Sequence, residues 1–194
     1  MRTVCPTYLR TRRLLLRRWK PSDFPPFAKM NAEPRVMEFM LRKMTPEETR
    51  HKIDGIAANF NAHGFGLWAV EIAASEKFIG FVGLAVPGYK LPFTPCVEIA
   101  RRLCAEEWGK GYAPEAAREA IRDGFERVGL QEIVSFTAAT NSKSRRVMEK
   151  LGMRYSPAED FEHPLVPEGN TLRRHVLYRL KRADWRVKAI SPGC

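Results

Sequence analysis

The feature that most restricts the fold of this 194-residue chain is a glycine-spaced turn between a predicted strand and an amphipathic helix. We expect the strand over Cys96–Leu103, the turn over Trp108–Ala113 and the helix over Pro114–Val128, with proline at the first helical position and Gly129 after the end. Apolar residues along the helix repeat with helical spacing and form one stripe: Ala117, Ile121, Phe125 and Val128. Beside it runs a row of small residues that would let the helix approach a sheet closely: Ala113, Ala116, Ala120 and Gly124.

Strands and helices alternate through the rest of the chain. A short helix after Ser22 or Asp23, either of which can cap it, should end before Pro34. Two further helices are predicted, at Pro46–Gly64 after Thr45 and at Ser142–Leu151 between Asn141 and Gly152. The other predicted strands are Thr11–Trp19, Gly66–Ala73, Phe78–Val86, Glu132–Ala138 and Leu172–Leu180. This order predicts one α/β domain over 1–194, with its core at about 10–180, a mixed central sheet flanked by helices on both faces, and a basic tail at 181–194.

Composition excludes several classes of protein. With 44% hydrophobic and 28% charged residues, the chain has the composition of an ordered globular domain. It has no apolar run long enough to span a membrane and no signal peptide, so we expect a cytoplasmic protein with no membrane partner. Four cysteines lie too far apart for a zinc site or a disulfide framework, so no metal is expected: Cys5, Cys96, Cys104 and Cys194.

The excess of positive charge is confined to the two ends of the chain. The formal net charge is +11, with seven basic and no acidic residues in 1–20, and seven basic residues against Asp184 alone in 171–194. Two interpretations are open. These charges can form an ordinary solvated surface, or they can attract an anionic partner such as a phosphorylated cofactor or RNA.

The turn at Trp108–Ala113 predicts an anion site. The first amides of a helix have no partner within the helix, and glycines let the backbone wrap closely around a ligand such as a pyrophosphate. Arg101, Arg102 and Lys110 would add positive charge nearby, although the glycines can also serve only as turn residues. The spacing matches neither the nucleotide-triphosphate loop nor the dinucleotide-binding fingerprint.

The run Trp108-Gly109-Lys110-Gly111-Tyr112-Ala113 resembles the acetyl-CoA pyrophosphate loop of the GNAT superfamily of N-acetyltransferases, and more closely its Rim-type branch, which acetylates α-amino groups of ribosomal proteins and other small amines. The family pattern Gln/Arg-x-x-Gly-x-Gly/Ala matches Trp108, Gly111 and Ala113, with tryptophan at the first position as is usual in that branch. Asn141–Arg145 followed by Leu151-Gly152-Met153, and the opening run Arg12–Arg17, are also similar to the branch.

The resemblance implies a GNAT fold and direct transfer of an acetyl group from acetyl-CoA to a primary amine, with both substrates bound at once. It casts Glu98 as the base that relays the ammonium proton and Ser144 as the group that stabilises the departing thiolate. Structural roles are the alternatives: a surface or ion-paired glutamate, and ordinary first-turn chemistry for the serine. The residues that it assigns to the cofactor are Arg101, Arg102, Leu103, Trp108, Gly109, Lys110, Gly111, Tyr112, Ala113, Asn141, Ser144 and Arg145.

The acceptor cannot be predicted from the sequence. A ribosomal protein and a small molecule both remain open as substrates, the resemblance is compatible with a homodimer, and the acceptor loops are expected at Phe24–Met44, Pro87–Pro95 and Glu159–Asn170. His163 could touch the acceptor but is expected at the surface, whereas four aromatic residues are expected in the core: Phe60, Phe65, Trp68 and Phe81. Two other functions stay open, a non-catalytic sensor of acyl-CoA and a ribosome- or RNA-binding module.

Overall fold

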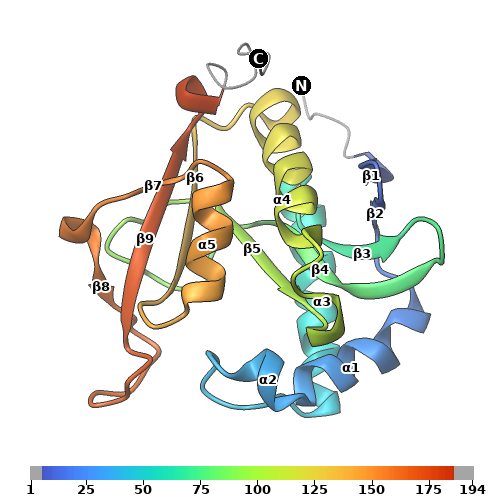
Figure 1. Ribbon diagram of the computed structural model, residues 1–194, viewed down its shortest axis with the longest axis horizontal. Coiled ribbons are helices and arrows are strands. Elements are labelled where there is room, and N and C mark those ends of the chain that lie inside the picture. The colour runs from blue at the N-terminus through green and yellow to red at the C-terminus, as the bar shows by residue number, and fades with distance from the viewer. Residues whose placement is uncertain (1–5, 186–194) are drawn as a thin grey trace.

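The computed structural model describes residues 6–185 and shows a nine-stranded mixed sheet with helices on both faces (Figure 1). Neighbouring strands follow the order β1-β2-β3-β4-β5-β6-β9-β7, and β8 also pairs with β9. The strands are β1 (Tyr8–Arg10), β2 (Leu14–Arg17), β3 (Leu67–Ile72), β4 (Lys77–Ala85), β5 (Glu98–Leu103), β6 (Glu132–Ala138), β7 (Arg154–Tyr155), β8 (Phe161–Glu162) and β9 (Arg174–Lys181). The α/β fold with a mixed sheet is therefore confirmed, and β1, β7 and β8 are short strands that the sequence did not predict.

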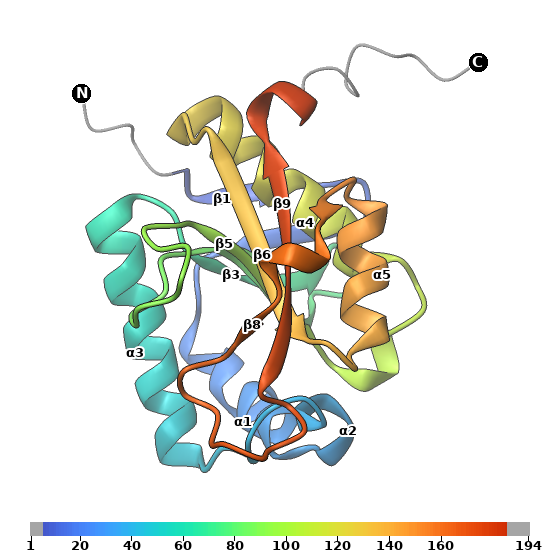
Figure 2. The ribbon, with the colours of Figure 1, turned by 90° about the vertical axis from the view of Figure 1, so that its left-hand side faces the viewer.

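Helices lie on both sides of the sheet: Figure 2 shows α3 on one side and α4 and α5 on the other. The α-helices are α1 (Phe24–Ala32), α2 (Pro34–Met37), α3 (Pro46–His63), α4 (Tyr112–Asp123) and α5 (Ser142–Lys150). Short 3-10 turns are η1 (Pro21–Asp23), η2 (Ala105–Glu107) and η4 (Pro157–Glu159), and α4 continues as the π-helical segment η3 (Gly124–Val128).

The predicted boundaries of α3 and α5 are confirmed because local chemistry determines them. Thr45 caps α3: its hydroxyl accepts from the Glu48 amide at 3.2 Å, and the Glu48 carboxylate accepts from the Thr45 amide at 2.8 Å. Gly64 then ends the helix in the left-handed conformation. At α5, the Asn141 side chain accepts from the Ser144 amide at 3.1 Å.

The start of α4 differs from the prediction. The helix begins at Tyr112, two residues earlier than expected, so Pro114 is its third residue rather than its first. Gly111 precedes it with φ of 81°, a left-handed conformation that glycine adopts without strain. The predicted close approach to the sheet is confirmed at Gly124, where a Cβ atom would lie 2.6 Å from Leu84 Cδ1 on β4.

Asp23 was predicted as an alternative cap for α1, but its side chain makes no capping bond to that helix. It instead accepts two hydrogen bonds from Arg17, at 2.7 and 2.8 Å, and one from the Lys20 amide. Arg17 Nε also donates to Glu71 at 2.7 Å, and all three side chains are buried. This ion triad joins β2, β3 and the start of α1, and a strong buried cation outcompetes a helix N-terminus for the carboxylate.

The hydrophobic residues form two clusters. The larger contains the predicted core aromatics Phe60, Phe65, Trp68 and Phe81, so that expectation is confirmed. The smaller lies at β6, β8 and β9 and consists of Leu91, Val134, Phe161 and Leu177. Tyr89 and Phe93 are half-buried against this smaller cluster, so the 87–95 loop covers it.

The ends of the chain carry fewer free cations than the sequence suggests. Arg13 pairs with Glu115, Arg173 with Glu162, Arg174 with Asp160, and Arg179 with Glu132 and Glu159. Such pairing leaves less charge for a nucleic acid.

Most of the predicted basic tail, with Cys5 and Cys194, lies outside the described residues, and Cys96 and Cys104 are free thiols. No helix in residues 6–185 is long and apolar enough to cross a membrane.

Candidate active site

Strands β5 and β6 are parallel neighbours that meet at one position and then diverge (Figure 1). The meeting point is the pair Glu98–Val134, next to which the Val134 amide donates to the Val97 carbonyl at 2.9 Å. Beyond it, no strand in residues 6–185 pairs with the edge of β5 that faces β6. A cavity of about 490 Å³ opens beside this edge, between α2, β5, α4 and α5.

Ten of the predicted site residues line this cavity, brought together from two strand-to-helix junctions and one strand. They are Arg101, Arg102, Leu103, Trp108, Gly109, Gly111, Tyr112, Ala113, Asn141 and Ser144. Lys110, Arg145 and the predicted base Glu98 are not among the lining residues. Lys110 pairs with Glu107 at 2.9 Å, and Arg145 donates to the Tyr178 hydroxyl at 3.3 Å and to the Ala139 carbonyl. Lys110 is thus held by Glu107, which itself lines the cavity, whereas the partners of Arg145 do not line it.

The glycine turn offers a row of unpartnered backbone donors. Within residues 6–185, the amides of residues 109 to 113 make no hydrogen bond to another group, and the first intrahelical bond runs from Glu115 to the Gly111 carbonyl at 3.3 Å. Pro114 has no amide hydrogen to contribute. Together with the positive end of the α4 dipole, five successive amides make a site suited to a diphosphate.

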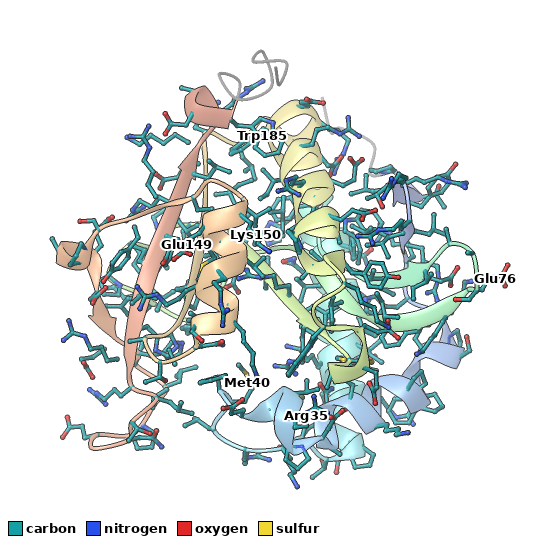
Figure 3. The ribbon with its side chains drawn as sticks, viewed as in Figure 1. Arg35, Met40, Glu76, Glu149, Lys150 and Trp185 are labelled. Atoms are coloured by element: carbon teal, nitrogen blue, oxygen red, sulfur yellow. The ribbon has the colours of Figure 1, made fainter. Side chains whose placement is uncertain are left out.

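Several cations at this cavity come from residues that sequence reasoning missed. Helix α5 presents Lys143, Arg146 and Lys150 to it, and Arg35 reaches it from α2; Figure 3 shows Lys150 and Arg35 on these two elements. Lys143 Nζ lies 4.7 Å from the Trp108 ring centroid. The three- and four-residue spacing of the α5 cations places them on one helix face, and this spacing was the signal available in the sequence.

The open edge of β5 can also bind a ligand through its backbone. Peptide groups alternate between the two edges of a strand, so those of residues 99, 101 and 103 face the opening. The Ile99 carbonyl accepts from the Ser135 hydroxyl at 3.1 Å, and the Leu103 carbonyl accepts from the Trp108 indole at 2.9 Å. The Arg101 peptide group between them is therefore the one that remains for an extended ligand.

Arg101 bridges the gap between the diverging strands with its side chain. Its guanidinium donates to the Ser135 hydroxyl at 3.1 Å and to both the carbonyl and the hydroxyl oxygen of Ser144, at 2.8 and 2.9 Å. Because Ser144 Oγ accepts from a cation, its own hydroxyl proton remains available to a second acceptor. Asn141 holds the adjacent turn through the Ser144 amide.

Glu98 lies at the point where β5 and β6 separate, with its side chain on the opposite face from that of Ile99, as strand alternation predicted. Burial raises the pKa of its carboxyl to about 7, against the opposing effects of Lys52 and Arg101. Among the described side chains, none forms an ion pair with Glu98. It is therefore partly ionised near neutral pH and able to exchange a proton.

His163 was expected at the surface, and that expectation is wrong. It is only 8% exposed, its ring lies 4.6 Å from that of His175, and its Nε2 lies 3.2 Å from the Tyr89 hydroxyl. Burial and the neighbouring His175 lower the pKa of His163 to about 4, so the ring is neutral at pH 7. The predicted acceptor loops 87–95 and 159–170 thus meet at this histidine, because aromatic side chains of both loops pack into the same cluster.

A metal site requires several ligating side chains within reach of one ion. No group of three or more histidine, cysteine, aspartate or glutamate residues with that arrangement occurs in the part of the chain that the structure describes.

Comparison with known proteins identifies the class to which this fold and site belong. The family model described as the acetyltransferase (GNAT) domain matches residues 13–154. The FsC-acetyl coenzyme A-N(2)-transacetylase of Aspergillus fumigatus is 36% identical over an alignment of 130 residues that covers 63% of this chain and 52% of that protein. The chain thus spans about half the length of this curated relative.

Solved structures agree. A GNAT-family acetyltransferase from Bacillus anthracis superposes with a TM-score of 0.73 at 25% identity, covering 91% of this chain and 99% of that one. The ribosomal-protein-S5-alanine acetyltransferase of Vibrio fischeri superposes with a TM-score of 0.73, covering 93% and 99% of the two chains, but at 20% identity it shares the fold alone. The chain belongs to the GNAT acetyltransferase family. Members of this family are acyltransferases whose donor is acetyl-CoA.

Proposed function

We propose that the protein transfers the acetyl group of acetyl-CoA directly to a primary amine while both substrates are bound, as in the Rim-type branch that its motifs resemble. The observation that carries this proposal is the row of unpartnered amides at residues 109 to 113, next to a cavity of about 490 Å³. Acetyl-CoA supplies the acetyl group as a thioester, and transfer forms an N–C bond while the C–S bond breaks.

The residues around the cavity divide the binding of acetyl-CoA among them. The amides of the glycine turn would hold the pyrophosphate, with Arg35, Lys143, Arg146 and Lys150 supplying positive charge at the rim. The free Arg101 peptide group would pair with the pantetheine arm as another strand would. This arrangement directs the thioester toward the point where β5 and β6 separate.

Two side chains are suited to the proton transfers. The Glu98 carboxylate would accept the proton that the amine loses, directly or through one water molecule. Ser144, whose hydroxyl oxygen already accepts from Arg101, would donate a hydrogen bond to the departing sulfur. The ammonium nitrogen loses two protons as it becomes an amide: one passes to Glu98, and the other reaches the thiolate and completes free CoA. Arg101 adds positive charge beside the anion that develops.

Binding of acetyl-CoA and transfer to an amine are the two results that test the proposal. Calorimetry should detect one site for acetyl-CoA, and a thiol reagent should detect CoA release with a panel of amines that includes amino acids, polyamines and peptides. Mass spectrometry of the amine should show the added acetyl group. Stoichiometric binding with no transfer to any amine would instead indicate a sensor of acyl-CoA.

Substitution of Gly109 by alanine should weaken acetyl-CoA binding by about 10-fold, equivalent to one hydrogen bond to a charged group. Gly109 has φ of 79°, and the added methyl group would stand in the turn that wraps the pyrophosphate. Gly129→Ala is a matched control, since Gly129 has φ of 82° and equally open surroundings but lies at the other end of the helix. Equal dissociation constants for the two variants would contradict the pyrophosphate assignment.

Ser144→Ala should lower kcat by about 10- to 100-fold, because the thiolate loses one charge-assisted hydrogen bond. The Michaelis constant for acetyl-CoA should change little. Ser142→Ala removes an exposed hydroxyl two residues earlier on the same helix and serves as the control. Steady-state kinetics that show the same kcat for both variants would assign Ser144 a structural role only.

A further inference from the structure

Two cations lie on the Glu98 face of the sheet, over one aromatic ring. Lys52 Nζ of α3 lies 5.7 Å from the centroid of the Phe81 ring, and the Arg102 guanidinium carbon of β5 lies 5.6 Å from it. Arg102 and Glu98 are both even-numbered residues of β5, so their side chains share this face. We refer to Lys52 and Arg102 together as the cation pair.

Neutral groups hold Arg102 in place. Its Nη1 donates to the Asn31 side-chain oxygen at 2.7 Å, and its Nη2 lies 3.1 Å from the Met40 sulfur. Asn31 is fully buried and donates in turn to the Thr49 hydroxyl at 3.2 Å, which fixes its orientation. The guanidinium is therefore positioned without being neutralised.

The cation pair has no carboxylate partner. Among the described residues, neither Lys52 nor Arg102 has an ion pair within 4.0 Å, in contrast to Arg17, which binds two buried carboxylates. Burial and the positive charge of Arg102 lower the pKa of Lys52 to about 8, and burial lowers the pKa of Arg102 to about 10. Glu98 offsets part of the charge of Lys52 from a distance, and an anionic ligand in direct contact with the two half-buried cations would stabilise them further.

The cation pair also lies between two hollows. Arg102 lines the cavity at the β5 edge, and Lys52 lines a second, more open groove between α3 and the end of β4. Ala85, which lies directly opposite Glu98 in the β4–β5 ladder, lines the same groove. Gly55 of α3 also lines the groove, and a Cβ there would meet nothing within 4 Å. Lys52 therefore borders this groove, and its charge acts on both Glu98 and Arg102.

The charges indicate which anion fits. Lys52 donates no hydrogen bond to a described residue, and Arg102 uses only part of its five N–H donors. The cation pair carries two positive charges, and Glu98, which also interacts with Arg101, offsets only part of them. A carboxylate can bind a guanidinium through two parallel N–H···O bonds, so it fits the free donors of Arg102 beside Lys52.

We infer that the acceptor is a small primary amine that itself carries a carboxylate, such as a free amino acid, and that Lys52 and Arg102 bind this carboxylate while the amine faces Glu98. The inference rests on the proposed function and narrows it. A protein N-terminus, whose α-amine has no adjacent carboxylate, would leave the cation pair unneutralised.

The direct test compares amino acids with their C-terminal amides as acceptors, using CoA release. The free acids should give kcat/KM at least about 10-fold higher, as expected for a hydrogen-bonded charge pair. Intrinsic reactivity favours the amides, because their amino group is less basic and a larger fraction of it is neutral. A preference for the free acids would therefore have to come from binding. Calorimetric titration of the same compounds into the complex with CoA, where no transfer occurs, should show binding of acids and much weaker binding of amides.

Variants assign the effect to the cation pair. Lys52→Met and Arg102→Met should each raise KM for the acid about 10- to 100-fold with little change for the amide. Lys52→Arg and Arg102→Lys keep the charge and should retain part of the preference. Lys29→Met removes an exposed charge from α1 and should change neither substrate.

Four results would overturn the inference. The first is that the amides react as well as the free acids or better. The second is that the methionine variants weaken both substrates equally, which would show that the cation pair has a structural role. The third, acetylation of polyamines or peptides alone, would refute the inference but leave the proposed function intact. Absence of CoA release with every amine, despite acetyl-CoA binding, would refute both.

Discussion

Replacement of Glu98 by glutamine should lower kcat/KM for the acceptor amine by about 10²–10⁴-fold, the usual contribution of a positioned general base. The amide keeps the size of the side chain but cannot accept a proton. Burial raises the pKa of the wild-type carboxyl to about 7, so the active carboxylate form increases as the pH rises through 7. The wild-type rate should therefore rise up to about pH 7, and this step should be absent from the pH profile of the E98Q variant.

The titratable neighbours of Glu98 also affect the pH profile of the rate. Lys52 and Arg101 both lower the pKa of Glu98, while Tyr89 and Cys96 are near enough for Glu98 to raise their pKa values. Lys52, whose pKa burial lowers to about 8, titrates close to Glu98 and interacts with it, so the pH profile of the K52M variant is needed to assign the step to Glu98. Glu106→Gln removes an exposed carboxylate near the cavity and should leave the profile unchanged. A full-rate E98Q enzyme would show that another group, or solvent, takes the proton.

Arg17→Met should lower the free energy of unfolding by about 3–5 kcal/mol, the cost of leaving buried charges without their partner. Arg17 is 7% exposed and lies between Asp23 and Glu71, which are 1% and 5% exposed. Methionine fills similar volume but leaves two carboxylates facing each other in the interior. Urea or guanidinium denaturation followed by circular dichroism measures the loss.

A control variant separates the loss of the buried ion triad from the loss of an ordinary surface charge. Arg12→Met removes an exposed cation from the same segment and should change stability by less than about 0.5 kcal/mol. Adding Asp23→Asn and Glu71→Gln to Arg17→Met should restore part of the lost stability, because the uncompensated charges are then removed as well. A single variant as stable as wild type would mean that solvent reaches the triad.

Much of the architecture followed from local patterns. The Thr45–Glu48 cap, the Asn141 cap and the left-handed glycines are set by residues within a few positions of one another. The order of strands and helices then limited the fold to an α/β sheet. The start of α4 differs from the prediction by two residues. The helix begins directly after the left-handed Gly111, and Pro114, which was expected at its first position, is its third residue.

Contacts across long sequence separations could not be predicted in the same way. His163 is buried because two loops fold over the same aromatic cluster, and Asp23 binds Arg17 and not its own helix. The basic face of α5 can bind a ligand only because packing puts this helix beside the cavity, and the sequence of the helix does not indicate that position.

The sequence by itself determined the glycine turn, the helix that follows it, and the identity of Glu98 and Ser144 as candidates, since these depend on short-range backbone geometry and on motif resemblance. Only the tertiary structure decided that Lys52 of α3 and Arg102 of β5 share one aromatic ring near Glu98. The reason is physical: desolvation and the distance between charges depend on packing between segments that are far apart in the chain, and no local pattern records them.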